Sequence, residues 1–233
     1  MRSRFARFAA VPVSAAAVLA GAVLIALWAL PASAAEPPQH AAAAAPAATA
    51  AAPADAKAAT EKKMQAQMEM YVKLAEPGDR HKQLAGMAGK WTTTGKTWMD
   101  PSQPAIDFKG TVEFTPLLGG RYVRSVHKGS FFGRPFEGQA TDGYDNATHE
   151  YFSTWIDNYG TGVMVFKGTC DDPCKVLTET AEAFDPMMGK VVKSKEVYTF
   201  VDPDTYRFEM YMVGATPDGK DVKVMEMLGK RDK

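Results

Sequence analysis

Two residue types that build many reactive centres are scarce in this sequence of 233 residues, which has two cysteines and four histidines. The histidines show neither the H-x-H nor the H-x-x-x-H spacing of a zinc site. A glycine-rich phosphate loop and a serine in a nucleophile elbow are also missing. We therefore expect no metal and no cofactor, and the sequence alone identifies no catalytic centre.

An excess of charge of either sign is missing too, because 27 lysines and arginines balance 27 aspartates and glutamates. Neither a basic arm nor an acidic tail breaks this balance. A protein that binds nucleic acid needs a clustered basic surface. Nucleic acid is therefore not an expected partner.

The one long hydrophobic run lies at the N-terminus and has the features of a secretory signal. Three arginines within residues 2–7 precede an apolar stretch from Ala9 to Leu30, and small residues follow. This pattern predicts a signal peptide over residues 1–34, cleaved after Ala32-Ser33-Ala34, and hence a periplasmic or extracellular protein. The alternative is an uncleaved membrane anchor, because the apolar stretch is nearly long enough to span a bilayer. Cleavage would leave a mature form without a membrane partner.

Two segments separate this signal from the main domain. Residues 35–60 are almost wholly alanine with some proline, and we expect a flexible tether because they have too little apolar bulk to fold. Residues 61–76 carry four apolar side chains at helical spacing, namely Met64, Met68, Val72 and Ala75. This spacing predicts an amphipathic helix with Thr60 as its N-cap. Its methionine-rich stripe would either pack on the following domain or meet a partner.

From Gly89 to Lys230 turn signals recur at intervals of about a dozen residues, and the stretches between them alternate apolar with polar residues. The expected strands are 90–99, 106–114, 121–128, 137–144, 149–157, 161–169, 175–184, 191–201, 205–213 and 221–229. Because every connection is short, neighbours in sequence should pair. The pattern predicts an all-β domain over residues 84–231, an antiparallel up-and-down barrel of ten strands that can close around one small molecule.

The two cysteines, Cys170 and Cys174, flank a turn in the sequence C-D-D-P-C. In an oxidising compartment, thiols this close across a turn should form a disulfide. A redox motif usually has two residues between its cysteines, and a metal site would need further ligands nearby. A structural disulfide is the prediction, and a redox or metal role is the alternative.

The start of the barrel resembles the Gly-x-Trp motif of the calycins, the superclass of lipocalins and fatty-acid-binding proteins, through Gly89 and Trp91. In that group the tryptophan closes one end of the barrel, and a basic residue from the last strand lies over it. The resemblance implies that Lys230 or Arg231 covers Trp91.

A more specific resemblance links the domain to a bacterial family, often exported, that is known only as domain of unknown function 1579. Matching runs follow one another in order along most of residues 84–230, among them 98–101 (WMDP), 117–122 (LLGGRY), 153–157 (STWID) and 208–211 (FEMY). The resemblance implies a barrel and supplies no activity. The tether and the cysteine pair fall outside the family pattern.

Several strands place aromatic and ionisable residues on one face, where they either meet solvent or line a polar cavity for a ligand. For a cavity, the expected lining residues are Arg121, Tyr144, Trp155, Asp157, Glu209, Tyr211, Lys223 and Glu226. Trp155 and Tyr211 would stack on the ligand. Arg121 and Lys223 would hold an anionic group. The hypothesis is a protein that binds a small amphiphilic or polar organic molecule in the mouth of the barrel.

Three alternatives come from other functional classes. A haem could be held through His127 or His149. An enzyme of hydrolase or isomerase type would need a carboxylate pair for acid–base chemistry, and the candidates are Glu137, Asp157, Glu209 and Glu226. The domain could instead dock on an envelope partner through its helix and tether, without any ligand. The oligomeric state is not predicted.

Overall fold

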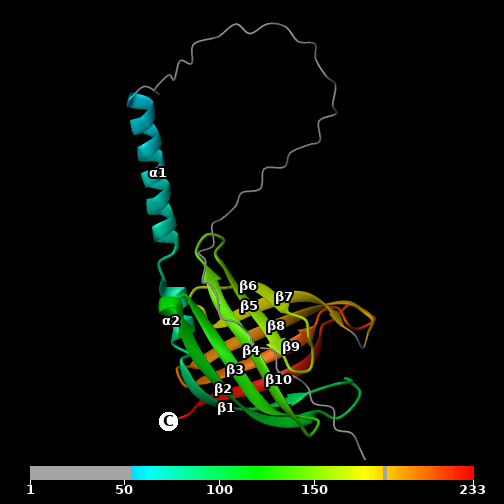
Figure 1. The fold of residues 1–233 in the computed structure, drawn as a ribbon. Coiled ribbons are helices and arrows are strands. Elements are labelled where there is room, and N and C mark those ends of the chain that lie inside the picture. Colours follow the sequence, from blue (N-terminus) through cyan, green and yellow to red (C-terminus); the bar gives the residue numbers. More distant parts are fainter. Residues whose placement is uncertain (1–53, 186–187) are drawn as a thin grey trace, which may run out of the picture. The chain divides into compact units, whose positions relative to one another are not determined.

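The computed structural model of the protein describes residues 54–185 and 188–233. The predicted signal peptide and residues 35–53 of the predicted tether lie outside the described residues. The described chain consists of two helices followed by ten strands (Figure 1). Within this part of the chain, no helix is long and apolar enough to cross a membrane.

Helix α1 spans Ala54–Leu74 and starts earlier than predicted. Thr60 therefore lies inside the helix, where its hydroxyl donates to the carbonyl oxygen of Ala56 over 2.9 Å, and the prediction that it caps the helix is wrong. All residues from 55 to 76 are exposed. Met64, Met68 and Val72 are each more than half exposed, so the expectation that this stripe packs on the following domain is wrong as well.

A second helix, α2, spans Asp79–Ala85 and was not expected from the sequence. Its seven residues make about two turns, which is too short for a periodic apolar pattern to stand out. It buries His81 and Leu84 and packs against β3 and β4. Helix α2 thus belongs to the domain core.

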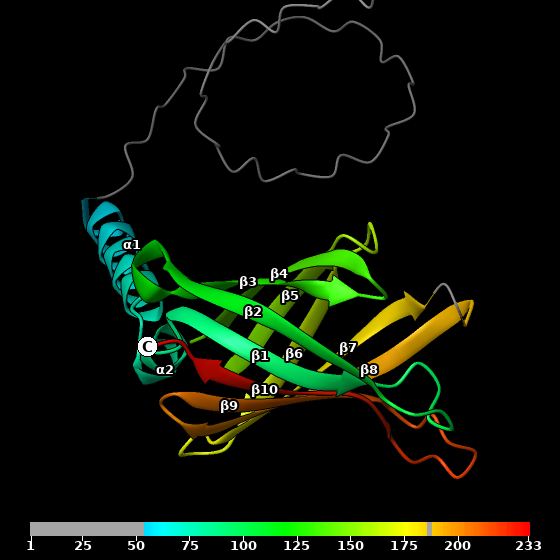
Figure 2. The same ribbon diagram turned by 90° about the horizontal axis from the view of Figure 1, so that it is seen from below.

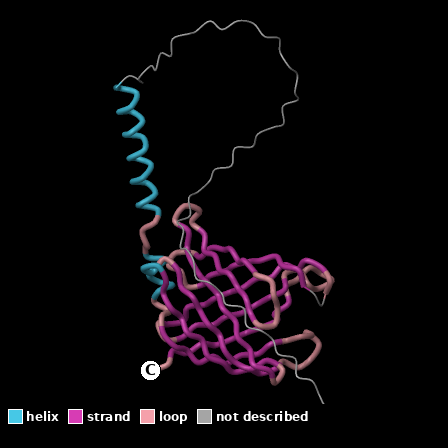
Figure 3. The backbone as a smooth tube through the Cα atoms, in the orientation of Figure 1, coloured by secondary structure: helices cyan, strands magenta, loops and turns pink. Residues whose placement is uncertain are grey.

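The ten strands form one closed antiparallel barrel (Figure 2), as predicted. They are β1 (Gly89–Thr97), β2 (Ile106–Leu117), β3 (Tyr122–Phe131), β4 (Arg134–Asp145), β5 (Glu150–Asp157), β6 (Met164–Cys170), β7 (Val176–Asp185), β8 (Lys190–Asp202), β9 (Thr205–Met212) and β10 (Val222–Arg231). Each strand pairs with its neighbours in sequence, and β1 pairs with β10 to close the barrel. The tube trace in Figure 3 shows this continuous wall of strands.

Alternate residues of each strand point into the barrel, and these form the core. On β1 the buried residues are Trp91, Thr93 and Thr97, which are two or four positions apart. On β10 the inward position next to Tyr206 must be a glycine, because a Cβ at Gly229 would lie 2.1 Å from the tyrosine ring. The tyrosine ring occupies the space that a side chain on β10 would fill.

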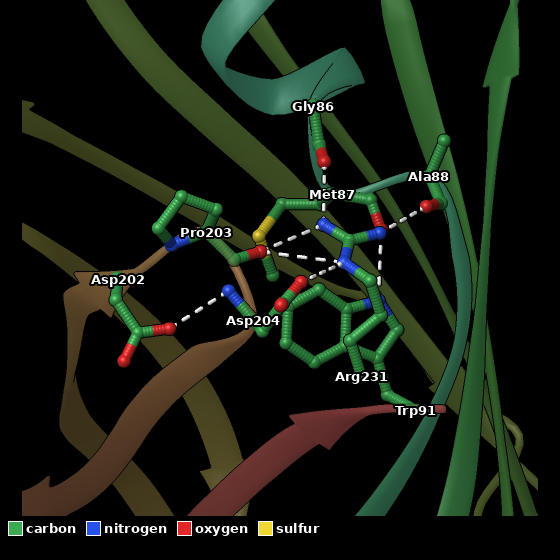
Figure 4. A network of polar contacts seen from close by, with 8 residues as sticks. All are labelled: Gly86, Met87, Ala88, Trp91, Asp202, Pro203, Asp204 and Arg231. Carbon is green, nitrogen blue, oxygen red and sulfur yellow. Dashed lines mark hydrogen bonds and ion pairs between the residues drawn. The ribbon is translucent and has the colours of Figure 1, made fainter. Parts of the chain in front are cut away.

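The end of the barrel beside α2 is sealed by Trp91, which is completely buried. Its indole nitrogen donates to the carbonyl oxygen of Met87 over 2.8 Å, and the guanidinium of Arg231 lies 4.3 Å from its ring centroid (Figure 4). Arg231 also donates to the carbonyl oxygens of Gly86 and Ala88 and pairs with Asp204 over 3.0 Å. The expected cation over the tryptophan is therefore Arg231, and it joins the last strand to the segment that covers the barrel.

The opposite end of the barrel is less tightly filled. Several side chains that point inward there are only half-buried, among them Phe108, His127, Trp155, Met210 and Met225. A side chain that points into a closed barrel and still meets solvent must border space inside it. We refer to these two ends as the sealed end and the open end.

The predicted disulfide is present. Cys170 at the end of β6 bonds to Cys174 in the turn before β7, with the two Cα atoms 5.3 Å apart. The side-chain amide of Gln83 in α2 donates to the carbonyl oxygen of Cys174 over 2.8 Å. The bridged turn is thereby attached to the helix at the sealed end.

Candidate functional site

Three of the inward-facing carboxyl groups in the described part of the chain act on one another: Asp142 on β4, Glu179 on β7 and Glu196 on β8. Each lies between inward-facing neighbours two residues away, as Glu179 does between the buried residues Leu177 and Ala181. Glu179 and Glu196 are direct partners in the β7–β8 pairing. Side chains so paired lie roughly 5 Å apart at their Cβ atoms, and like charges there repel each other.

The interior raises the pKa of all three acids, because burial disfavours their charged forms. The pKa of Asp142 rises to about 7 through burial. Burial, and then the charge of Asp142, raise the pKa of Glu179 to about 8. The pKa of Glu196 is raised well above its ordinary value by burial and by the charges of the other two. Near neutral pH the cluster therefore holds protons that exposed carboxylates would have lost.

Three tyrosines surround these acids. Tyr198 and Tyr206 have pKa values raised by burial and by the neighbouring acids, so they stay neutral hydroxyls. Burial also raises the pKa of Tyr151, against the opposing charge of nearby Arg80. Together these six side chains offer three carboxyls and three phenolic hydroxyls, which we call the acid–tyrosine cluster.

Part of this cluster has no partner. Among the described residues, three buried side-chain atoms lack a hydrogen bond: Glu179 Oε1 and the hydroxyls of Tyr151 and Tyr206. Glu179 is 2 % exposed, and no lysine or arginine in the described part of the chain forms an ion pair with it, with Asp142 or with Glu196. Buried polar atoms are nearly always paired in folded proteins, so these atoms require an explanation.

A small cavity lies beside the cluster, toward the sealed end. Glu179, Asp142, Tyr151 and Tyr198 line it together with apolar side chains such as Leu84, and its volume is about 30 Å³. That volume holds about one group the size of a water molecule. The described residues contain no set of three acidic, histidine or cysteine side chains placed to bind a metal ion.

Aromatic side chains gather at the open end. Trp155 stacks on Phe136 with ring centroids 6.3 Å apart, and Tyr159 packs on Phe131 and Phe136. The exposed ring of Phe132 adjoins Phe131, with centroids 4.4 Å apart. An apolar rim at the mouth above a polar cluster in the depth is an amphiphilic interior.

The sequence-predicted site residues are divided among four places. Trp155 and Asp157 point inward at the open end, where the indole nitrogen donates to Asp157 over 2.8 Å. Tyr144 lies near the sealed end, with its ring 4.9 Å from that of Tyr151. Arg121 lies in the turn before β3, where its guanidinium donates to the carbonyl oxygen of Leu118 over 2.9 Å. These four therefore do not form one group.

The other four predicted residues lie together on the outer face of β9 and β10. Lys223 donates to Glu209, binds Glu226 over 3.3 Å and lies 5.7 Å from the ring centre of Tyr211. The ion pair lowers the pKa of Glu209. Glu209, Lys223 and Glu226 border an open groove of about 880 Å³. A role for these residues in binding stays a prediction, and they share no chamber with Trp155.

The residues of the alternative functions do not converge either. His127 is inward-facing, beside Ser125 over 3.1 Å, and burial lowers its pKa to about 4. His149 is exposed in the turn before β5. Glu137 pairs with Lys128 over 3.6 Å at the surface, away from Glu209 and Glu226. Of the carboxylates proposed for acid–base chemistry, Glu209 and Glu226 therefore lie together around Lys223 on the outer face, whereas Glu137 and Asp157 lie elsewhere on the barrel.

Sequence reasoning missed the acid–tyrosine cluster, although a signal for it was available. Glu196 stands two residues from Ser194 and two from Tyr198, on the inward face of β8. Glu179 interrupts the apolar face of β7 in the same way. Acidic side chains are rarely buried in a protein unless they are paired. Their inward positions on two strands would therefore have identified Glu179 and Glu196 as candidates.

Comparison with known proteins identifies the family of this chain. A family model matches residues 76–231, which are most of the chain. The chain belongs to the family described as "Protein of unknown function (DUF1579)". No curated protein matches the sequence.

Among solved structures, Rv2717c from M. tuberculosis is similar with a TM-score of 0.51 and 13% sequence identity, over 68% of this chain and 100% of that one. The S-type phycobiliprotein lyase CPES from Guillardia theta has a TM-score of 0.44 and 13% identity, over 65% of this chain and 92% of that one. At such low identity the first likeness shows the fold alone. This member of the DUF1579 family is thus a ten-stranded, calycin-like barrel.

Proposed function

We propose that this DUF1579 protein is exported and binds a small amphiphilic organic molecule inside its barrel. The observation that carries the proposal is the interior itself, where buried polar atoms of Glu179, Tyr151 and Tyr206 have no hydrogen-bond partner among the described residues. A ligand with polar hydrogens would satisfy such atoms. The half-buried side chains and aromatic rim of the open end supply an entrance and an apolar wall.

Two further features support export. The first is the predicted signal peptide over residues 1–34. The second is the Cys170–Cys174 disulfide, because such bonds persist in oxidising compartments. N-terminal sequencing of the protein from fractionated host cells tests this part. We expect a mature N-terminus directly after Ala34 in the periplasmic or extracellular fraction, and a cytoplasmic protein with an intact Met1 would contradict it.

Binding is tested by native mass spectrometry of the protein purified from its own host. We expect a mass above that of the chain, which disappears when the protein is denatured and leaves a small organic molecule in solution. The matched variants Ala140→Leu and Thr141→Leu locate the ligand, since Ala140 is buried and points inward whereas Thr141 is its neighbour on the outer face. Ala140→Leu should lose the added mass and Thr141→Leu should keep it. An empty wild-type protein would contradict the proposal.

A further inference from the structure

We infer that the ligand carries a cationic head group, an organic ammonium, which the acid–tyrosine cluster binds in the depth of the barrel. This inference rests on the proposed function and names the chemical class of its ligand. It follows from the composition of the cluster, from its unpartnered atoms and from the shape of the interior.

The first step is the missing positive charge. Asp142, Glu179 and Glu196 approach one another from three strands, and none has an ion pair among the described residues. A buried carboxylate without a counter-charge is strongly disfavoured. Arg80 on the covering helix pairs with Asp172 over 3.4 Å and opposes the rise that burial causes in the pKa of Tyr151, but it forms no ion pair with the three acids. An ammonium ion would supply the counter-charge that the described residues do not.

The second step is the match of donors and acceptors. A primary ammonium group has three N–H donors and no acceptor. The cluster presents Glu179 Oε1 and two tyrosine hydroxyls as buried, unpartnered atoms. The faces of tyrosine rings also attract organic cations. An anionic head group would be repelled by the acids once they lose their protons, and a neutral one would leave the ionised carboxylates without a counter-charge.

The third step is the shape of the interior. The cavity beside Glu179 and Asp142 has room for about one water-sized group, which suits an ammonium head but no ring or branched group. Toward the open end the inward-facing side chains include Met210, Met225 and Trp155. An unbranched apolar tail would lie along these residues, with its end at the aromatic rim.

The experiment titrates three probes of equal length, namely octylamine, octan-1-ol and octanoate, into the dialysed protein by isothermal calorimetry at pH 8.5. Octylamine should bind at least tenfold more tightly than either other probe, because it alone brings a positive charge together with N–H donors to the carboxylates. Glu179→Gln and Glu196→Gln should each weaken octylamine binding about tenfold or more. Glu182→Gln is the matched control, because Glu182 is exposed on the same strand, and it should leave the affinity unchanged.

The pH dependence gives a second readout. The groups facing the head group are Asp142 on β4, Tyr151 on β5, Glu179 on β7, Glu196 and Tyr198 on β8, Tyr206 on β9 and Arg80 on α2. Of these, the three acids hold protons near neutral pH, and a cation must displace them. Octylamine affinity should therefore rise from pH 6 to pH 8.5 with release of protons to the buffer, whereas octan-1-ol affinity should not rise.

Three outcomes would overturn the inference. If octan-1-ol or octanoate bound as tightly as octylamine, the result would contradict the cationic head group and leave the proposed binding chamber intact. Octylamine binding that both glutamine variants retain would place the cation elsewhere. If none of the three probes binds while the native mass spectrum still shows a small molecule, the ligand class is wrong and the proposed function stands.

Discussion

Replacing Glu179 with glutamine should stabilise the folded protein at alkaline pH, although it removes a charged group from the core. The pKa of Glu179 is about 8 in the folded protein against an ordinary value of 4.5, chiefly because burial disfavours its charge. A group whose pKa is raised by folding contributes stability that is fully present below its unfolded pKa. That stability is lost as the pH rises from about 4.5 through about 8.

The size of the effect follows from the same two values. One pKa unit corresponds to about 1.4 kcal/mol, so the difference between about 8 and 4.5 sets an upper bound of about 5 kcal/mol for this one carboxyl. Water that enters from the open end and relaxation of the neighbouring acids reduce this figure. We expect Glu179→Gln to gain about 2 to 4 kcal/mol relative to the wild type between pH 5 and pH 9.

Urea unfolding at a series of pH values, followed by circular dichroism, measures this difference. Because both proteins are compared at each pH, the contributions of the other titrating groups largely cancel. Glu182→Gln is again the control, and its stability should track that of the wild type, since Glu182 is exposed. A constant difference between Glu179→Gln and the wild type across this pH range would refute the reasoning.

Three further predictions concern other parts of the barrel. Arg231→Ala should lower the free energy of unfolding by about 2 to 3 kcal/mol in urea titrations, because it removes a cation over Trp91 and several hydrogen bonds to main-chain carbonyls. Arg231→Lys should recover less than half of this lost stability. Replacing both cysteines by serine should cost about 2 kcal/mol, since the closed loop is short, and a calorimetric melting curve unchanged by the replacement would contradict this. Lys223→Met should cost less than about 1 kcal/mol because its ion pairs are partly exposed, and it should leave octylamine binding unchanged.

The sequence predicted the barrel well because its signals are local. Period-two alternation and turn residues mark each strand, and short connections leave sequential pairing as the economical topology. The cation over Trp91 also followed from the calycin resemblance, and the structure identifies it as Arg231. Helix α2 escaped notice because its place is determined by packing on β3 and β4, which local periodicity does not report.

The candidate site could be predicted only in part, because a single β-bulge reverses which face of the barrel each later residue of the strand points to. Pairing along β10 shifts between Lys223 and Met225, so that Lys223 opposes Tyr211 while Met225 opposes Met210. Simple alternation puts Lys223 and Met225 on the same face. The β-bulge separates them, and Lys223 joins Glu226 outside the barrel. No local pattern in the sequence predicts such a change of pairing register.

Two explanations of the inward-facing acids can be distinguished by experiment. In the first the acids affect only the stability of the fold, and in the second they also bind a ligand. On the outer face of the barrel Glu179 would cost little stability, whereas inside it opposes Glu196 and lowers stability as the pH rises from about 4.5 through about 8. If the acids had no role beyond the fold, Glu179→Gln would gain stability and lose nothing. If they hold a cationic ligand, the same variant gains stability and loses affinity for octylamine. The free energy of unfolding and the affinity for octylamine can be measured on one protein preparation. The variant therefore distinguishes a core that merely tolerates buried acids from a binding site whose charge lowers the stability of the fold.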